Sequence, residues 1–345
     1  AGSGPAARAQ ALPLEGLPGS PPWGRMARRV PLAERPCGRT ARALKSAVAE
    51  HRLLLLRGAL FEALTPRGQA NTHVALASQL ADGGLIAGQM SPHPNSVHPQ
   101  LFRVSNDPAS GITGVGTNGW HVDGTHKLVP QLMHSFHCTA AADGGDTFFL
   151  PLDELFLAQP PDVQDRWSSL WVRTGRGIVH PFVHRHPATG RPSLCLFMGS
   201  HFVSFDGGRR ATDTASVFAE VGAAIHAAQH LVYRHRWETG DLLIHDNLAT
   251  AHLASAGTQA PASQVGLRVL DRAAVAGARP LRAWAPERLP EHSGGGQDGS
   301  SFIDIQERRG FLRRLWHSQI RHDMSEEQLE GLRVECADAG LDVDG

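Results

Sequence analysis

Short apolar runs, broken by glycine or proline turns, limit the fold of this chain more than any other feature. Between residues 128 and 290 they cover 132–138, 146–150, 177–182, 194–197, 241–245 and 266–275. Segments of this length and spacing are typical of strands in a sandwich or jelly roll. A helical pattern at 212–230 interrupts them. We therefore expect a mainly β domain with flanking helices.

The segment before these runs predicts an α+β opening. Residues 53–56 are four leucines in a row, which indicates a buried strand. Thr65 followed by Pro66 is typical of a helix start, and the helix is expected to reach residue 80. Residues 84–119 are rich in Gly, Pro, Asn and Ser and predict loops around one strand at 101–104. Such loops are candidates for a lid.

The two ends of the chain differ in composition from this domain. Residues 1–30 are rich in Ala, Gly, Pro and Arg, with Glu15 as the single acid, and favour a disordered tail over a transit peptide. Residues 292–296 have the composition of a flexible linker, and 325–328 resemble a capping box before a last helix. We expect a tail at 1–30, one domain at 31–290, and a linker with accessory helices at 291–345.

Composition narrows the partners and the compartment. Lys plus Arg and Asp plus Glu number 33 each, so no basic field indicates nucleic acid. The four cysteines lack CxxC spacing and fit a reducing compartment. No apolar run approaches the roughly 20 residues that span a bilayer. We expect a cytoplasmic protein without membrane or nucleic-acid partners, with organellar import and homo-oligomerisation left open.

The tetrapeptide Trp120-His121-Val122-Asp123 carries the first chemical motif. On an extended segment His121 and Asp123 project to the same side, so both can reach one metal. One distant histidine completes a 2-His-1-carboxylate face, which suits non-haem Fe(II) and an oxygenase. His252 is the candidate for this ligand, and His245 is the alternative. His121 alone would more often be a hydrogen-bonded core residue.

Arg268 and Thr147 predict a site for a second small molecule. An arginine in an apolar strand needs an anionic partner when it is buried, and its guanidinium pairs bidentately with a carboxylate such as that of 2-oxoglutarate. A structural salt bridge is the alternative for Arg268, and more so for Arg272, which projects to the same face. The Thr147 hydroxyl is placed to donate to the same carboxylate, or it is only a β-branched strand residue.

Five motifs in order make the chain resemble the taurine dioxygenase (TauD/TfdA) family. They are Trp-His-x-Asp-x-Thr (120–125), Gly-Gly-Asp-Thr (144–147), His-Pro to His-Pro-x-Thr-Gly (180–190), Asp-Asn with a following His (246–252), and Arg-x-x-x-Arg (268–272). The resemblance covers roughly residues 50–285. Several ordered motifs over such a span are very improbable by chance.

The resemblance implies a double-stranded β-helix, that is, a jelly roll of the clavaminate synthase-like type. It implies Fe(II) bound by His121, Asp123 and His252, and 2-oxoglutarate bound by Thr147 and Arg268. Arg272 is then expected to face the anionic group of a small substrate, a sulfonate, sulfate ester or carboxylate. The activity implied is that of a 2-oxoglutarate-dependent dioxygenase, an oxidoreductase that consumes O2, hydroxylates its substrate and releases succinate and CO2.

The chain departs from the family pattern in ways that concern the substrate. His245 stands where tryptophan is usual, His126 stands where an aromatic is common, and the segment from His252 to Arg268 is about five residues longer than usual. Two other functions are compatible with the motifs: a non-oxidative hydrolase or lyase with Zn(II), and a catalytically silent relative that binds a small acid. The hydrolase or lyase explains the three metal ligands but leaves Arg268 and Thr147 unexplained.

Overall fold

A seven-stranded sheet forms one wall of the molecule in the computed structural model, which describes residues 12–19, 23–32, 36–58, 64–80, 93–116, 119–199, 202–206 and 213–285. In spatial order its strands are β1 (Leu14–Glu15), β2 (Arg25–Arg28), β3 (Leu53–Arg57), β13 (Leu242–Asp246), β5 (Gln131–Ala140), β15 (Val269–Ala276) and β4 (Phe102–Ser105). β2 and β3 run parallel, and the other neighbours are antiparallel.

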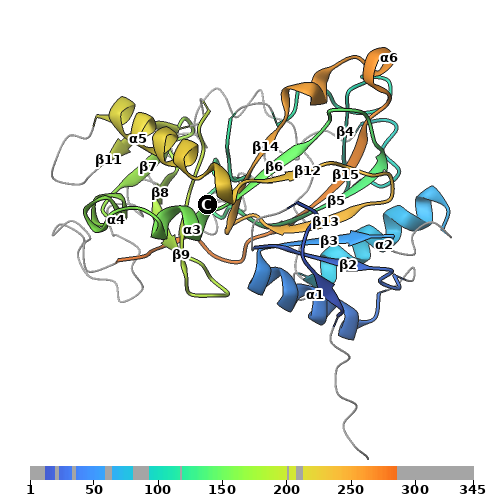
Figure 1. The fold of residues 1–345 in the computed structure, drawn as a ribbon, viewed down its shortest axis with the longest axis horizontal. Helices are drawn as coiled ribbons and strands as arrows, with labels where there is room; N and C mark the ends of the chain where they lie inside the picture. The colour runs from blue at the N-terminus through green and yellow to red at the C-terminus, as the bar shows by residue number, and fades with distance from the viewer. Residues whose placement is uncertain are drawn as a thin grey trace, which may run out of the picture.

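Strand β3 shows why a continuous apolar run suits this wall. Successive side chains of a strand point to opposite faces. Leu54 and Leu56 pack in the cluster that joins the sheet to helices α1 (Gly38–His51) and α2 (Pro66–Leu80), both of which lie on one face (Figure 1). Leu53 and Leu55 pack in the cluster on the other face. Both faces are buried, so the predicted buried strand is confirmed.

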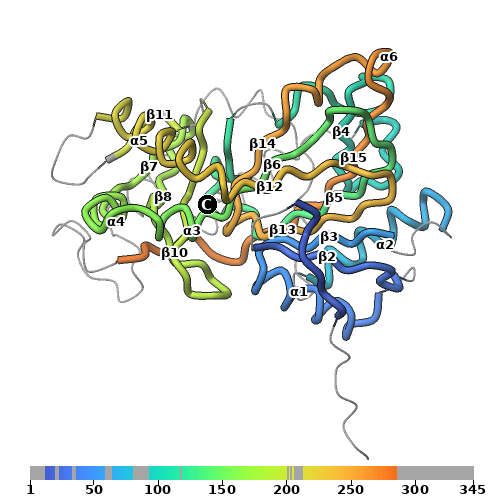
Figure 2. Tube along the Cα trace, viewed as in Figure 1, coloured from blue at the N-terminus to red at the C-terminus, as the bar shows by residue number. Residues whose placement is uncertain are grey.

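A second sheet faces the first and closes the interior. It has the order β12 (Tyr233–His235), β6 (Thr147–Pro151) and β14 (Thr250–Ala254). Figure 2 shows β6 in green beside β14 in gold, although about a hundred residues separate them in the chain. Phe149 and Tyr233 of this sheet share a buried cluster with Phe136, Leu243 and Leu270 of the large sheet. The predicted metal ligand His252 lies on β14 of this second sheet.

A third unit, on the left in Figure 1, packs around an apolar cluster that also includes Leu150 of β6 and Ala251 of β14. It contains sheets of order β11-β7-β8 and β10-β9-β16 with several short helices. Its strands are β7 (Trp171–Thr174), β8 (Val179–Pro181), β9 (Val183–Arg185), β10 (Pro192–Leu194), β11 (Phe202–Asp206) and β16 (Arg282–Ala283). Its helices are α3 (Leu152–Leu157), α4 (Pro161–Ser168), α5 (Thr214–Ala227) and the 3₁₀ turn Gln229–Leu231. The 3₁₀ turn Ala256–Gln259 and α6 (Ala262–Val265) lie between β14 and β15.

The N-terminal segment differs from the expected tail. β1 and β2 lie within residues 1–30, yet they extend the large sheet, and Met26 and Ala27 are buried there. The tail prediction is therefore wrong for residues 14–15 and 25–28, because these strands are only two and four residues long and lie in a segment rich in Arg and Pro. The predicted linker and accessory helices at 291–345 lie outside the described residues.

Other elements agree in position and differ in detail. Pro66 begins α2 as predicted, and the Thr65 hydroxyl caps it by accepting from the Gly68 amide at 3.2 Å. The strand expected at 194–197 is instead β10 at 192–194, with Phe197 in an isolated bridge to His121. The helix expected at 212–230 spans 214–227. Among the described residues, no helix is long and apolar enough to cross a membrane.

Candidate active site

Backbone hydrogen bonds hold the two histidines of the predicted metal site against each other. The His121 amide donates to the His252 carbonyl at 3.1 Å, and the His252 amide donates back to the His121 carbonyl at 2.9 Å. Such a reciprocal pair places the two side chains on the same side of the ribbon. The loop that follows Gly119 is therefore fixed to β14, and residues 131 positions apart in the chain become neighbours.

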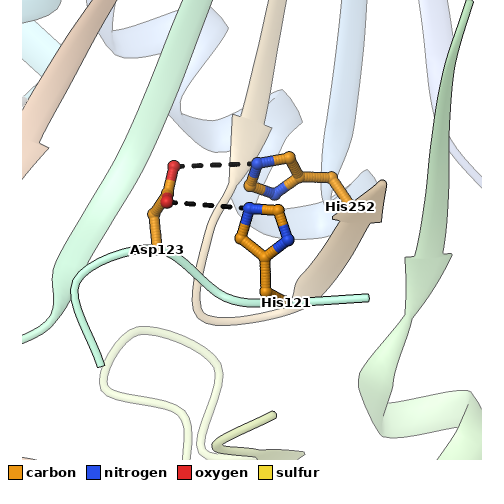
Figure 3. A group of neighbouring side chains, drawn as sticks. All are labelled: His121, Asp123 and His252. Carbon is orange, nitrogen blue, oxygen red and sulfur yellow. Dashed lines mark ion pairs between the residues drawn. The ribbon is translucent and has the colours of Figure 1, made fainter. Parts of the chain in front are cut away.

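The side chains of His121, Asp123 and His252 converge on one point (Figure 3). Their ligand atoms lie within 4.8 Å of one another. His121 Nε2 is 3.8 Å from Asp123 Oδ1, and His252 Nε2 is 3.6 Å from Asp123 Oδ2. These separations leave space for an ion bound by all three groups.

The tautomer of His121 suits metal binding. Its Nδ1 lies 2.8 Å from the Gly119 carbonyl, which only accepts, so Nδ1 carries the proton and Nε2 presents its lone pair to Asp123 and His252. Burial holds the pKa of His252 well below its ordinary value. The His252 ring is therefore neutral, which is the form of histidine that coordinates a metal.

Asp123 is ionised. Burial alone would raise its pKa, but the adjacent Arg272 guanidinium reverses this effect and the pKa is held well below its ordinary value. Arg272 Nη1 donates a hydrogen bond to Asp123 Oδ2 at 2.5 Å. The sequence did not predict Asp123 as the partner of Arg272. The contact is a structural ion pair, which was the alternative interpretation of Arg272.

Asn247 fixes the loop that carries Asp123. Its Oδ1 accepts from the Asp123 amide at 3.0 Å, and its Nδ2 donates to the carbonyls of Asp123 at 3.0 Å and Gln131 at 2.6 Å. Asn247 is fully buried in the turn after β13. The sequence motif included Asn247 without assigning it a role, and its three hydrogen bonds identify one.

Arg268 is buried with no carboxylate partner among the described residues, at 6 % exposure. Its Nε donates to the Gly145 carbonyl at 3.0 Å, and a Cβ at Gly145 would come within 2.6 Å of Arg268 Cδ. Asp146, the nearby acid, is paired with Arg234 at 2.5 Å. Burial lowers the pKa of Arg268 to about 10, so the side chain is still charged at neutral pH.

Thr147 lies on β6, two residues beyond Gly145. Its Oγ1 accepts a hydrogen bond from Trp237 Nε1 at 3.0 Å. The indole is a donor only, so the Thr147 hydroxyl proton stays available for another acceptor. Trp237 was not singled out in the sequence, because the contact arises from the pairing of β12 with β6.

His245, the rival of His252, is outside the converging group. It is fully buried, stacks on Phe136 with ring centroids 5.8 Å apart, and its Nδ1 lies 2.8 Å from Thr250 Oγ1. The histidines of the 180–190 motif stabilise loops instead. His180 Nε2 lies 2.9 Å from the Thr125 carbonyl, and His186 Nε2 lies 3.0 Å from Asp246 Oδ2.

Comparisons with known proteins identify the family of the chain. The model of the family described as "Taurine catabolism dioxygenase TauD, TfdA family" matches residues 15–270. A sulfate ester dioxygenase from Pseudomonas putida is 27% identical over 275 residues, covering 70% of this chain and 82% of the relative. A 2,4-dichlorophenoxyacetate dioxygenase from Cupriavidus pinatubonensis is 28% identical over 175 residues, covering 44% of this chain and 59% of the relative.

Solved structures share the fold. A taurine dioxygenase from Burkholderia xenovorans superposes with a TM-score of 0.62 at 23% identity, covering 79% of this chain and 91% of that chain. AAD-2 in complex with Mn(II) and N-oxalylglycine gives a TM-score of 0.61 at 19% identity, covering 79% and 99%. The expected jelly roll is thereby confirmed. The chain belongs to the taurine catabolism dioxygenase TauD, TfdA family.

Proposed function

We propose that this dioxygenase uses Fe(II), 2-oxoglutarate and O2 to hydroxylate a small anionic organic substrate, with release of succinate and CO2. The observation that carries the proposal is the convergence of two imidazoles and one ionised carboxylate within 4.8 Å. This donor set with open positions suits non-haem Fe(II). Relatives named as alpha-ketoglutarate-dependent dioxygenases of sulfate esters and sulfonates support it.

His121, Asp123 and His252 would hold the metal. When bound, Fe(II) with 2-oxoglutarate and O2 supplies an oxidant that replaces a substrate C–H hydrogen by hydroxyl. The protein's part is to fix the ligands. Gly119 sets the tautomer of His121, and Asn247 fixes the backbone of Asp123.

Arg268 and Thr147 would bind the distal carboxylate of 2-oxoglutarate. Arg268 is a buried cation whose nearby acid, Asp146, already pairs with Arg234. A dicarboxylate co-substrate supplies the missing charge, and the free hydroxyl proton of Thr147 adds a neutral donor. A Zn(II) hydrolase or lyase would leave both features without a purpose.

Arg272 would bind the anionic group of the substrate by exchanging partners. Its guanidinium now contacts Asp123 and lies 5.0 Å from the Phe102 ring, while its Nε is buried without a hydrogen-bond partner. A sulfate, sulfonate or carboxylate offers two or three acceptor oxygens and competes for this group. Hydroxylation of the carbon next to the heteroatom would then make the product fall apart.

An anaerobic titration tests the metal and co-substrate together. Adding Fe(II) and then 2-oxoglutarate to the metal-free protein is expected to produce a visible metal-to-keto charge-transfer band. Asp123→Ala should abolish the band, whereas His226→Ala, which changes an exposed histidine of α5, should leave it intact. The catalytically silent alternative predicts binding of 2-oxoglutarate without succinate formation under air.

The substrate class is tested by succinate release. Alkyl sulfates, alkyl sulfonates and phenoxy carboxylates are supplied in parallel, and one class is expected to stimulate succinate formation above the substrate-free rate. Arg272→Gln should raise the KM for that substrate and leave the 2-oxoglutarate affinity unchanged. An unaltered KM would show that Arg272 serves only as the ion-pair partner of Asp123.

A further inference from the structure

His134 is a fully buried histidine beside the active site that no motif identifies. It lies on β5 directly opposite His245 of β13. Its ring centroid is 5.2 Å from that of His245 and 6.1 Å from that of His252. The side chain therefore points into the interior between the two walls.

The two ring nitrogens of His134 have different surroundings. Nδ1 lies 3.5 Å from Asp123 Oδ2, about the same separation as that of His252 Nε2 from the same oxygen, and has no hydrogen-bond partner. Nε2 lies 2.5 Å from the side-chain amide oxygen Oε1 of Gln131. Gln131 is in turn held through its backbone carbonyl by Asn247.

The position of the Asp123 carboxylate decides which nitrogen of His134 carries the proton. Nδ1 faces Asp123 Oδ2 at 3.5 Å, and a neutral imidazole carries a single N–H. A carboxylate only accepts hydrogen bonds, and a bare lone pair on Nδ1 would repel it. The favourable arrangement places the proton on Nδ1 and turns the NH2 group of Gln131 toward Nε2, since amide oxygen and nitrogen occupy equivalent positions.

We propose that His134 is a positioning residue for Asp123, which holds Oδ2 through Nδ1–H and fixes the carboxylate that binds the metal. This role depends on the proposed function, because it requires Asp123 to be a metal ligand. Arg272 shares the same oxygen. When Arg272 turns to the substrate anion, His134 remains as the partner of Asp123 and keeps its orientation.

Metal affinity of the purified protein tests this role without any turnover. Removing an outer partner of a metal ligand lowers metal affinity by about 10- to 100-fold. We expect His134→Ala to weaken Mn(II) binding by that factor in an equilibrium titration followed by electron paramagnetic resonance. His134→Asn keeps a donor near the Nδ1 position and should retain most of the affinity, whereas His134→Gln places its amide near Nε2 and should not.

His137→Ala is the matched control, because it removes a buried histidine from the same strand on the opposite face. It should alter stability and leave Mn(II) affinity unchanged. Equal affinity in the wild type and in all three His134 variants would overturn the proposal. So would a Cu(II) spectrum that loses one nitrogen coupling in His134→Asn, because His134 would then be a ligand.

Nitrogen NMR of the metal-free wild type gives a second test that needs no variant to fold. The expected resonances are those of a neutral His134 ring protonated at Nδ1. A ring protonated at Nε2 would contradict the proposal even if metal binding behaved as expected. Absence of Mn(II) binding by the wild type would instead count against the proposed function, and the tautomer would still decide the role of His134.

Discussion

A buried guanidinium needs a counter-charge, and Arg268 has none among the described residues. We predict that Arg268→Ala lowers the affinity for 2-oxoglutarate by about 3 kcal/mol, roughly 100-fold, the size expected for a charged hydrogen-bonded pair. Calorimetric titration of 2-oxoglutarate into the Mn(II)-loaded protein measures the change. Arg185→Ala is the control, since Arg185 is exposed and stacks on Trp284. Unchanged affinity in Arg268→Ala would remove the co-substrate assignment.

The contact between Trp237 and Thr147 makes a finer prediction at the same scale. Trp237 Nε1 occupies one lone pair of Thr147 Oγ1 and so directs the hydroxyl proton elsewhere. Trp237→Phe is expected to weaken 2-oxoglutarate binding by about 1 kcal/mol, roughly fivefold, and Thr147→Val by at least as much. Because both act through one hydroxyl, the double variant should lose less than the sum. Additive losses would mean that Trp237 does not orient Thr147.

At the scale of elements, strong local patterns could be predicted and weak ones could not. β3 and α2 stood out through their leucine run and their Thr-Pro start. β14, Thr-Ala-His-Leu-Ala, has few residues that favour strands, and its pairing with β6 creates it. Helix α1 was missed although Ala41, Leu44, Ala47 and Val48 recur at helical spacing, because alanine makes a weak apolar stripe.

The site divides in the same way. His121, Asp123 and His252 belong to motifs that can be recognised in the sequence, and the structure brings the three side chains together. Asn247 and His134 act on Asp123 through contacts fixed by the register of β13 on β5. Register between strands more than a hundred residues apart is not visible in a single sequence, so these supporting residues could not be assigned a role from it.

The turn after β13 is the element whose loss should loosen the metal site. Asn247→Ala removes three hydrogen bonds to half-buried backbone groups of Asp123 and Gln131. We expect a loss of about 3 kcal/mol in the free energy of unfolding, measured with urea on the metal-free protein. Asn247→Asp should cost at least as much, because its carboxylate would face two carbonyls. Asn95→Ala, which removes an exposed side-chain hydrogen bond, should change stability by less than about 0.5 kcal/mol.

At the scale of the whole molecule, buried histidines link the packing of separate layers to pH. His73 of α2 lies 2.7 Å from the Ser135 hydroxyl of the large sheet, and His184 lies on β9 in the third unit. Burial lowers the pKa of each to about 3. The unfolded chain titrates near 6.5 and therefore binds more protons than the folded protein below that pH. Stability is full above pH 6.5 and falls as the pH drops toward 3.

This linkage predicts a measurable acid destabilisation. Between pH 7.5 and 5.5, His73 alone should lower the free energy of unfolding by about 1.4 kcal/mol, from a folded pKa of about 3 and an unfolded one near 6.5. His73→Gln keeps a polar atom near the Ser135 hydroxyl but takes up no proton. The loss in free energy of unfolding between the two pH values should therefore be smaller in this variant than in the wild type, by the contribution of His73. His226→Gln, which changes an exposed histidine of α5, is the control for the substitution itself. Urea unfolding of the metal-free proteins at both pH values makes the comparison. If the free energy of unfolding had the same pH dependence in the wild type and in His73→Gln, His73 would be protonated equally easily in the folded and in the unfolded protein.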